Sequence, residues 1–481
     1  MPKISAEDNI STSKIKRQRT TNNDASDDDG SAITIQQCEK VNQYNGWLVP
    51  HSNYQIPILS TEDDGLTPES FYRDYIRQRR PVIIRETLPS ELTNLNEWKS
   101  SNEYMTERAG DESIMVEKRS NNRDSFGRGT EIAVSFRQFM KLIEEGDTMH
   151  YLTTQDVAAN KDGRPDLMSS FMKKLQGQGG NPDFPLRPKL AGNLVPQNIN
   201  LWIGNSKDRT SSGLHHDYHD NFYIVLRGIK RFRLFSPADI EKMYTRGQLV
   251  KVHKNGRINY EGEITTAYGA DMQSDAASLA EMARKDAEER LVKAEKGVEE
   301  GMPGAEKELE LAEALLDEAM EAILDAETGS NIDVDEEFHL ETAKEEDIEG
   351  IDVDQMSSSS EEEDTSEIID ENICRLVDKT VKNPNNFSKI DPSLLDDDEK
   401  LKEDFPKILE ANPAFCTCHA GDMLYLPASW FHEVRSLSDS SSDTNGHMAF
   451  NYWFHPPDAE NDFKNPYSTD FWPNDFKNRS E

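Results

Sequence analysis

The sequence predicts a mainly β fold, a barrel or sandwich with flanking helices, that is interrupted by a long acidic insertion. Two groups of short apolar segments indicate the β fold, one beginning at Ile199 and the other at Ala414. Gly and Pro stand between the segments of both groups, which is typical of antiparallel strands with tight corners. The insertion is indicated by charge, because residues 261–372 hold 38 acidic and 7 basic side chains in a chain of 481 residues with net charge −37. Outside that segment the charge balance is that of an ordinary globular protein.

The part of the chain before the first group, residues 39–190, is predicted to combine helices with single strands. Apolar side chains recur at helical spacing in residues 71–76, and the sequence PVIIR after them is typical of a short buried strand. Residues 135–146 repeat the helical pattern, and the sequence HYLTTQD that follows is strand-like. Residues 1–38 are expected to form a disordered tail, because they hold too few apolar side chains to offset the entropy of ordering.

The β core is predicted to comprise residues 191–262 and 379–475, with a short tail at 476–481. In the first group INLWIGN, HDNFYIVLRG and KRFRLFSP have the pattern of successive strands, with Gly228 at a hairpin turn. In the second group AFCTCHAGDMLYLP, WFHEVRSL and HMAFNYWFHPP repeat this pattern. A run of short antiparallel strands of this kind favours a closed barrel or a sandwich.

The insertion between the two groups, residues 263–378, is predicted to be partly helical and partly disordered. Two stretches rich in Ala, Glu and Leu, 275–297 and 304–327, are typical of helices that meet in a hairpin at the Gly and Pro residues between them. The acidic low-complexity sequence beyond is expected to be disordered. We favour a solvated loop as the role of the insertion. The alternatives are an acidic lure for basic partners such as histone tails, and a regulatory segment.

Composition argues against a secreted disulfide scaffold and against a membrane-spanning protein. The cysteines Cys38, Cys374, Cys416 and Cys418 are too few and too irregularly spaced for a disulfide framework. No apolar run approaches the roughly 18 residues of a membrane span, and the polar N-terminus has no signal-peptide pattern. We therefore expect an intracellular protein of the nucleus or cytoplasm. The basic cluster KIKRQR at 14–19 fits a nuclear-import signal and a solvated charge run equally well.

Two histidines and a carboxylate form the most informative chemical pattern. His215 and Asp217 stand two residues apart in a segment predicted to be a strand, so their side chains share a face and could hold one metal ion. His219 shares that face and competes for the role. His432 follows an apolar strand more than 200 residues later. Two histidines with one carboxylate are the ligand set that holds a redox-active iron and leaves positions open for reactants, so the pattern predicts oxidative chemistry.

Other interpretations of these side chains are open from the pattern alone. The first pair could be a His-rich strand end without metal, and a histidine beside aromatic residues, such as His432, is often a core residue. Cys416, Cys418 and His419 form a C-x-C-H cluster, but no fourth ligand lies at a spacing suited to zinc. The two cysteines are therefore expected to be small core residues.

The sequences LHHDYHDNFYIVLRGIKRFRLFSP, GDMLYLPASWFHEVRSL and NYWF together resemble the JmjC domain. The similarity is to the small cupin-type JmjC oxygenases, which include the asparaginyl hydroxylase that inhibits hypoxia-inducible factor. It covers roughly residues 60–240 and 384–475. The resemblance implies a double-stranded β-helix, the jelly-roll or cupin fold, and an enzyme that uses Fe(II) with 2-oxoglutarate and O2 as cosubstrates.

The resemblance also assigns roles by position. His215, Asp217 and His432 match the iron ligands of the family. Lys230 matches the lysine that pairs with the distal carboxylate of 2-oxoglutarate, a task that needs a cation at fixed reach in a dry pocket. The neutral groups around the cosubstrate and an aromatic wall are matched by Tyr151, Ser212, Asn221, Asn451 and Trp453. Some relatives have Thr where this chain has Ser212, and the hydroxyl is kept.

Among the reactions that the resemblance allows, we favour hydroxylation of a protein side chain. The chain is small for the family and has no recognisable reader domain. Demethylation of N-methyl-lysine in histones is the alternative. An RNA hydroxylase is less favoured because the catalytic part has no strong basic excess. An inactive cupin-like binding module is disfavoured because every expected ligand is present. A protein substrate, a basic one among the candidates, is the expected partner, and a monomer is expected because no long C-terminal helices follow the last predicted strand.

Overall fold

The computed structural model describes most of the chain apart from the N-terminus and several loops. The expectations for the tail, for the basic cluster at 14–19 and for the low-complexity part of the insertion lie outside the described residues. The described residues are 41–60, 65–85, 90–92, 94–119, 129–159, 165–177, 182–206, 210–328, 384–438, 446–459 and 462–480.

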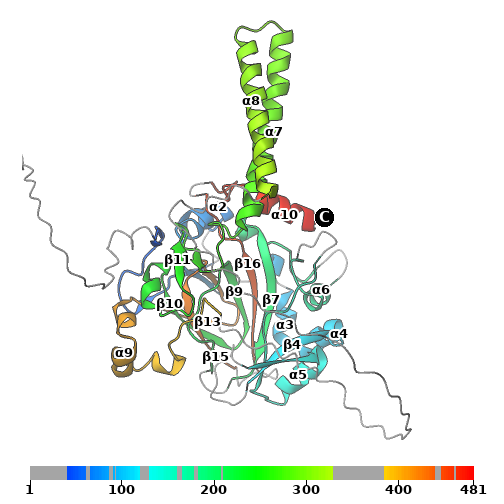
Figure 1. The fold of residues 1–481 in the computed structure, drawn as a ribbon. Helices are drawn as coiled ribbons and strands as arrows, with labels where there is room; N and C mark the ends of the chain where they lie inside the picture. The colour runs from blue at the N-terminus through cyan, green and yellow to red at the C-terminus, as the bar shows by residue number, and fades with distance from the viewer. Residues whose placement is uncertain are drawn as a thin grey trace, which may run out of the picture. The chain divides into compact units, whose positions relative to one another are not determined.

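Two large β-sheets make up the centre of the described structure (Figure 1). The first has nine strands, in the order β2 (Ile58–Ser60), β3 (Val82–Arg85), β14 (Met423–Leu426), β9 (Asp220–Arg227), β16 (His447–Phe454), β7 (Pro196–Gly204), β6 (His150–Leu152), β4 (Ser113–Lys118) and β5 (Thr130–Ser135). The second has five strands, in the order β1 (Tyr54–Gln55), β13 (Ala414–His419), β10 (Ile229–Phe235), β15 (Phe431–Leu437) and β8 (Thr210–Ser211). A separate pair is formed by β11 (Leu249–Val252) and β12 (Ile258–Tyr260).

Consecutive strands alternate between the two large sheets within each group of core strands, from β7 to β10 and from β13 to β16. Strand β9 belongs to the nine-stranded sheet and β10 to the five-stranded sheet, and β13, β14, β15 and β16 continue this alternation after the insertion. Strands β14 and β16 flank β9, and β13 and β15 flank β10, so the second group of strands completes both sheets started by the first. This connectivity is the double-stranded β-helix, and it confirms the predicted fold class.

The side chains of β9 show how the core and the interior of the fold are divided. Phe222, Ile224 and Leu226 are buried in an apolar cluster that also includes residues of the N-terminal helices. Asn221 and Tyr223 point to the opposite face and line a cavity. This alternation follows from the period of two along a strand, and it leaves polar side chains on the face that could hold a site.

Helices of the N-terminal part pack on the outer face of the nine-stranded sheet. Trp98 of α3, for example, meets Phe450 of β16 edge to face, with ring centroids 5.9 Å apart. Helix α5 begins at a capping box in which Ser135 and Gln138 bond each other's backbone, as its sequence favours. These helices are α2 (Pro68–Phe71), which continues as a π-helical turn (Tyr72–Ile76), α3 (Leu95–Ser100), α4 (Asn102–Ala109), α5 (Phe136–Glu144) and α6 (Ser170–Gln176).

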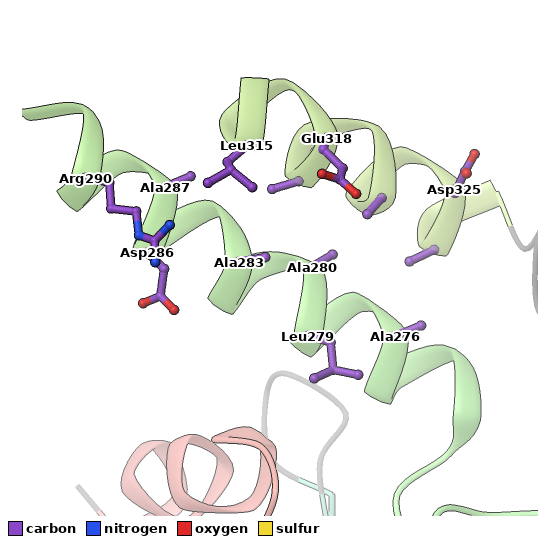
Figure 2. A pocket seen from close by; sticks show the side chains of 13 residues that line it. Ala276, Leu279, Ala280, Ala283, Asp286, Ala287, Arg290, Leu315, Glu318 and Asp325 are labelled. Carbon is purple, nitrogen blue, oxygen red and sulfur yellow. The ribbon is translucent and has the colours of Figure 1, made fainter. Parts of the chain in front are cut away.

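The helical part of the insertion is a pair of long helices, α7 (Met272–Glu299) and α8 (Ala305–Thr328). Alanines at intervals of seven residues are buried where the helices meet, namely Ala280, Ala287 and Ala294 on α7 and Ala312, Ala319 and Ala326 on α8. Small side chains allow the two backbones to approach closely. Between the helices lies an open groove of about 690 Å³. Figure 2 shows the side chains that line it, chiefly alanines together with Leu279, Leu315 and several charged residues.

The remaining helices are short. Helix α9 (Asp398–Asp404) and 3-10 turns at Ser90–Leu92, Lys189–Ala191, Pro237–Lys242, Pro392–Leu394 and Pro406–Glu410 connect the strands. Near the C-terminus, where the sequence predicted no long helices, the short helix α10 spans Phe471–Ser480. Pro473 suggests a break, but a proline in the first turn removes no helical hydrogen bond. Across the described residues, no helix combines the length and the apolar character needed to cross a bilayer.

Candidate metal centre

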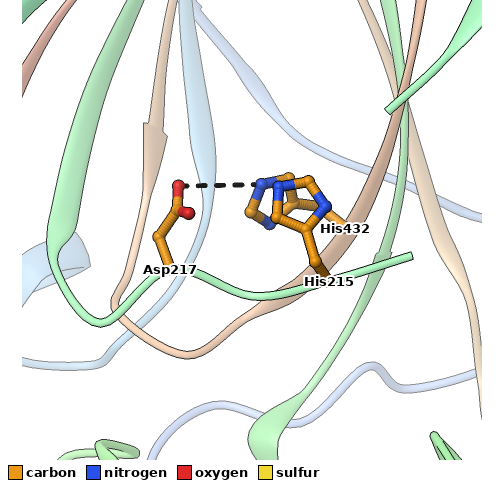
Figure 3. A group of neighbouring side chains, drawn as sticks. All are labelled: His215, Asp217 and His432. Carbon is orange, nitrogen blue, oxygen red and sulfur yellow. Dashed lines mark ion pairs between the residues drawn. The ribbon is translucent and has the colours of Figure 1, made fainter. Parts of the chain in front are cut away.

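The structure brings together the two histidines and the carboxylate that the sequence singled out. One ligand atom from each of His215, Asp217 and His432 can be chosen so that all three lie within 4.8 Å of one another. Nε2 of His432 is 3.8 Å from a carboxylate oxygen of Asp217, and the two imidazole centroids are 4.3 Å apart. Figure 3 shows the three side chains converging on one point between the strands.

Backbone pairing explains how residues so far apart in the sequence meet. The amide of His215 donates to the carbonyl of His432 at 3.1 Å, and the amide of His432 donates to the carbonyl of His215 at 2.7 Å. The segment around His215 is not the strand that sequence analysis assumed, because β8 ends at Ser211 and β9 begins at Asp220. The segment is a connection between strands of the two sheets, so two-residue periodicity does not govern it. Close pairing with β15 positions His215 instead.

The backbone also determines which ring nitrogen each histidine presents. Nδ1 of His215 lies 3.0 Å from the carbonyl of Gly213, and Nδ1 of His432 lies 2.9 Å from the carbonyl of Trp430. A carbonyl oxygen only accepts, so each Nδ1 carries the hydrogen and each Nε2 keeps a free lone pair. Phe387, from the segment after the insertion, stacks on His215 with centroids 4.7 Å apart and further orients the ring.

This donor set fits a divalent iron. Two neutral imidazoles and one carboxylate on one side of the ion leave its other positions open, and a backbone acceptor on the far nitrogen is the usual support for a metal-bound histidine. Burial, followed by the proximity of His432, lowers the pKa of His215 to about 4, so its imidazole is neutral near pH 7 and able to coordinate. All three side chains are at least partly buried, which limits access of bulk water.

A cavity of about 80 Å³ adjoins the three side chains. Both large sheets contribute to it, so it lies inside the double-stranded β-helix. Its lining comprises Tyr151, Trp202, Thr210, Ser212, His215, Asp217, Asn221, Tyr223, Phe232, Leu426, His432, Val434 and Ser436. Most of this wall is aromatic or neutral and polar, which suits a small anion that needs one cation for its charge.

Lys230 is the cation beside this cavity. The side chain is fully buried, and Nζ donates to Oγ of Ser436 at 2.7 Å and lies 3.1 Å from Nδ1 of His447. Ser436 lies directly opposite Lys230 in the register of β10 and β15 and is part of the cavity wall. Burial lowers the pKa of Lys230 to about 7. Such a buried cation, bonded to neutral groups, is suited to receive an anion.

The other predicted cosubstrate residues divide into two sets. Tyr151, Ser212 and Asn221 line the cavity. The Ser212 hydroxyl accepts from the amide of Val434 at 3.0 Å and donates to the carbonyl of Gly213 at 3.1 Å, so it also ties β15 to the segment before His215. Asn451 and Trp453 are not among the residues that line the cavity.

Asn451 and Trp453 lie behind that wall. The Asn451 amide donates to Oδ1 of Asn221 at 3.0 Å and accepts from the indole of Trp202 at 2.9 Å, so it positions two residues that do line the cavity. Trp453 contacts Trp202 edge to face at 6.1 Å and stacks against His219 at 5.8 Å. His219 thus packs among aromatic rings and is not part of the three-residue cluster.

The C-x-C-H cluster holds no candidate metal site within the described part of the chain, where the only such group is that of His215, Asp217 and His432. Cys416 and Cys418 are buried in an apolar cluster between the sheets. This placement agrees with their expected role as small core residues.

Several residues of the site were not predicted from the sequence. Ser436 and Val434 could have been found by counting in steps of two from His432 along the strand, because residues at that spacing share a face. His447 is related in the same way to Asn451. Trp202 and Thr210 belong to strands whose inward faces hold no charged residue that would have marked them.

Two sheets that exchange strands along the chain, with a His-Asp-His cluster inside, define a cupin-type metal-binding fold. Comparison with known proteins agrees, since a family model described as a cupin-like domain matches residues 68–460. JmjC domain-containing protein 4 of Schizosaccharomyces pombe is 34% identical over 89% of this chain and 90% of its own length. The chain belongs to the cupin-like JmjC family of oxygenases.

Two further relatives match a smaller part of the chain. The human protein named bifunctional peptidase and (3S)-lysyl hydroxylase JMJD7 is 31% identical over 38% of this chain and 55% of its own length. The Arabidopsis thaliana protein named lysine-specific demethylase JMJ32 is 24% identical over 38% of this chain and 52% of its own length. These two relatives are therefore named for three different activities: peptidase, lysyl hydroxylase and lysine-specific demethylase.

Proposed function

We propose that this protein is an Fe(II)- and 2-oxoglutarate-dependent oxygenase that hydroxylates a side chain of a protein substrate. The observation that carries the proposal is the pairing of an iron-type donor set with a buried lysine beside one small cavity. His215, Asp217 and His432 would hold the iron, and Lys230 would bind the distal carboxylate of 2-oxoglutarate. When bound, the iron supplies the oxidation of a C–H bond with O2 and 2-oxoglutarate.

The residues of the chain would contribute position, charge and exclusion of water. The carbonyls of Gly213 and Trp430 hold the two imidazoles in the tautomer that can coordinate. The Lys230 ammonium would supply the charge that a buried dicarboxylate needs, with Ser436 beside it as a neutral donor. The aromatic lining keeps the cavity dry, so these electrostatic contacts are stronger than in water.

Hydroxylation of a lysyl side chain is the more specific form that we favour. It is supported by the name of the human relative, which at 31% identity is more similar than the plant demethylase at 24% over a comparable length. Demethylation of N-methyl-lysine is the second candidate, supported by the name of the plant relative. Hydroxylation oxidises a carbon of the lysyl side chain, and demethylation begins by oxidising the methyl carbon on its nitrogen. The same site chemistry could therefore serve either reaction.

The first test asks whether the chain binds iron and 2-oxoglutarate together. Anaerobic addition of Fe(II) and 2-oxoglutarate should produce the weak visible absorption band of the chelate, and His215→Ala should abolish it. His219→Ala is the matched control, because this histidine lies four residues away and outside the cluster; its band should persist. A band that survives His215→Ala, or no band in the unaltered protein, contradicts the proposal.

The second test identifies the reaction. The protein is incubated with cell lysate, Fe(II), 2-oxoglutarate and O2, and peptides are examined by mass spectrometry. We expect a gain of one oxygen on a protein side chain, which is absent with Asp217→Ala. Release of formaldehyde with loss of a methyl group would support the demethylase instead.

A further inference from the structure

We propose that His447 is a positioning residue that aims the Lys230 ammonium into the cavity by accepting one of its N–H groups. The inference rests on the proposed function, in which Lys230 binds the distal carboxylate of 2-oxoglutarate. His447 is the first residue of β16, touches neither the metal centre nor the cavity directly, and acts through Lys230.

The contacts of His447 determine its tautomer. The ring is fully buried, with Nδ1 3.1 Å from Nζ of Lys230 and Nε2 3.2 Å from Oγ of Ser206. When Lys230 is charged, its ammonium only donates, so Nδ1 is then the acceptor and Nε2 carries the hydrogen that is donated to Ser206. Burial, followed by the nearby charge of Lys230, lowers the pKa of His447 well below its usual value, so the ring stays neutral.

The contact with His447 determines how the N–H groups of the Lys230 ammonium are distributed. A lysyl ammonium has three N–H groups. One is donated to Ser436 at 2.7 Å and a second to His447 at 3.1 Å, which leaves the third for a ligand in the cavity. A flexible lysine with two fixed hydrogen bonds loses less entropy on binding an anion than a lysine with one.

The surroundings of the ring are shaped to admit an imidazole. A Cβ built on Gly204 would lie 3.1 Å from Cε1 of His447, and one built on Gly228 would lie 2.9 Å from its Cβ. Gly228 has φ +72°, which favours glycine for the hairpin turn as well. Tyr151 also lies beside the ring, with centroids 5.9 Å apart. These neighbours restrict the space around the imidazole, and its hydrogen bonds place Nδ1 toward Lys230 and Nε2 toward Ser206.

The test measures 2-oxoglutarate binding by calorimetry on the full chain loaded with Fe(II) under anaerobic conditions. His447→Leu removes both polar contacts. His447→Asn keeps an acceptor at the place of Nδ1, whereas His447→Gln places its amide nearer Ser206. We expect Leu and Gln to weaken binding about tenfold or more, as for loss of a hydrogen bond to a charged group, and Asn to bind nearly as well as the unaltered protein.

Two controls separate positioning from general destabilisation. In a Lys230→Met background, His447→Leu should cost little further affinity, because its effect passes through the lysine. His150→Leu removes another buried histidine, one that bonds Asp147, and should leave 2-oxoglutarate affinity unchanged. If the unaltered protein binds 2-oxoglutarate and the Leu and Gln variants bind it equally well, the role of His447 is wrong. If the unaltered protein fails to bind it, the proposed function itself is wrong.

Discussion

At the scale of single residues, the site depends on a buried cation that is held by neutral groups. Lys230 is fully buried and bonds Ser436 and His447. Burial lowers its pKa to about 7, well below the usual value for lysine. Keeping a charge in this buried place costs free energy, and the dicarboxylate of the proposed cosubstrate would offset that cost.

This cost predicts proton uptake on binding 2-oxoglutarate. At pH 8, above its pKa of about 7, Lys230 in the free protein is mostly neutral, and the dianion raises that pKa by its charge. Binding at pH 8 should take up close to one proton and binding at pH 6 almost none, so affinity falls as pH rises from 7 to 9. Calorimetry in buffers of different ionisation heat measures the uptake.

The titratable side chains near Lys230 and in the cavity wall should not contribute to the measured proton uptake. Burial lowers the pKa of His447 and raises the pKa of Tyr151 and of Tyr223, so all three stay neutral from pH 6 to 9. Lys230→Met should show no proton uptake at pH 8. Equal uptake in that variant would mean that another group takes the proton.

At the scale of elements, a buried ion pair joins the helical N-terminal part to the strand that leads out of the metal centre. Asp220 begins β9, three residues after Asp217, and its carboxylate accepts from the guanidinium of Arg79. It also accepts from the hydroxyl of Tyr425 at 2.8 Å and from the amide of Ala428 at 2.9 Å. These contacts together fix the start of β9 against β14 and against the N-terminal part.

Removing one partner of this pair should destabilise the fold strongly. Arg79→Met leaves the carboxylate of Asp220 buried without its cation, which typically costs about 3–5 kcal/mol. The free energy of unfolding from urea titration measures the loss. Arg73→Met is the matched control, because Arg73 pairs with Asp74 on the exposed surface, and it should change the free energy of unfolding little. Equal losses in the two variants would contradict a special role for the buried pair.

The α7–α8 hairpin should depend on the small size of its buried alanines. Ala294→Leu introduces a larger side chain where the helices meet and outside the open groove, and overpacking of this kind costs about 1–3 kcal/mol. Hydrogen exchange should become faster throughout α7 and α8, while the β core stays protected. Val292→Leu adds bulk on the exposed side of α7 and should leave exchange unchanged. Faster exchange in both variants would indicate that the contact between the helices is not the cause.

At the scale of the whole molecule, most of the net negative charge lies in one insertion between β12 and β13, where only 7 basic side chains offset the acidic ones. Residues 261–372 hold 38 of the 91 acidic side chains, whereas the residues that form the metal centre and its cavity lie in the β core. The first part of this segment still belongs to the core, because Tyr268 and Ala270 are buried in a cluster with Tyr467. Separating the charged part from the site is therefore possible at Met272.

Deletion of residues 272–378 with a short Gly-Ser link should preserve the metal centre. We expect unchanged affinity for Fe(II) and 2-oxoglutarate, measured by the chelate band and calorimetry. Activity on a basic peptide distinguishes the two interpretations of the insertion. If the deletion leaves KM for the peptide unchanged, the insertion is a solvated loop. If the deletion raises KM, and high salt raises KM of the full chain in the same way, the insertion attracts basic substrates by its charge.

Much of the site is visible in the sequence because its chemistry resides in charged and metal-binding side chains. His215, Asp217 and His432 stand out by their residue types, and the resemblance to the JmjC domain adds Lys230. In the folded chain the first three adjoin one cavity and Lys230 bonds Ser436 in its wall. The helices α7 and α8 are also predictable, since alanine and leucine at helical spacing act locally.

The class of fold, the long helical hairpin and the charged residues of the site could be predicted from the sequence, because they depend on local patterns and on side-chain chemistry. Three features required the folded structure. His215 lies in a connection and not in a strand, and Asn451 and Trp453 lie behind the cavity wall. Ser436 and His447 both form hydrogen bonds with Lys230. The physical reason is that these contacts depend on the register between strands more than 200 residues apart. Alternation along a strand shows which residues share a face, but the partner across the sheet depends on how distant strands pack together in the core.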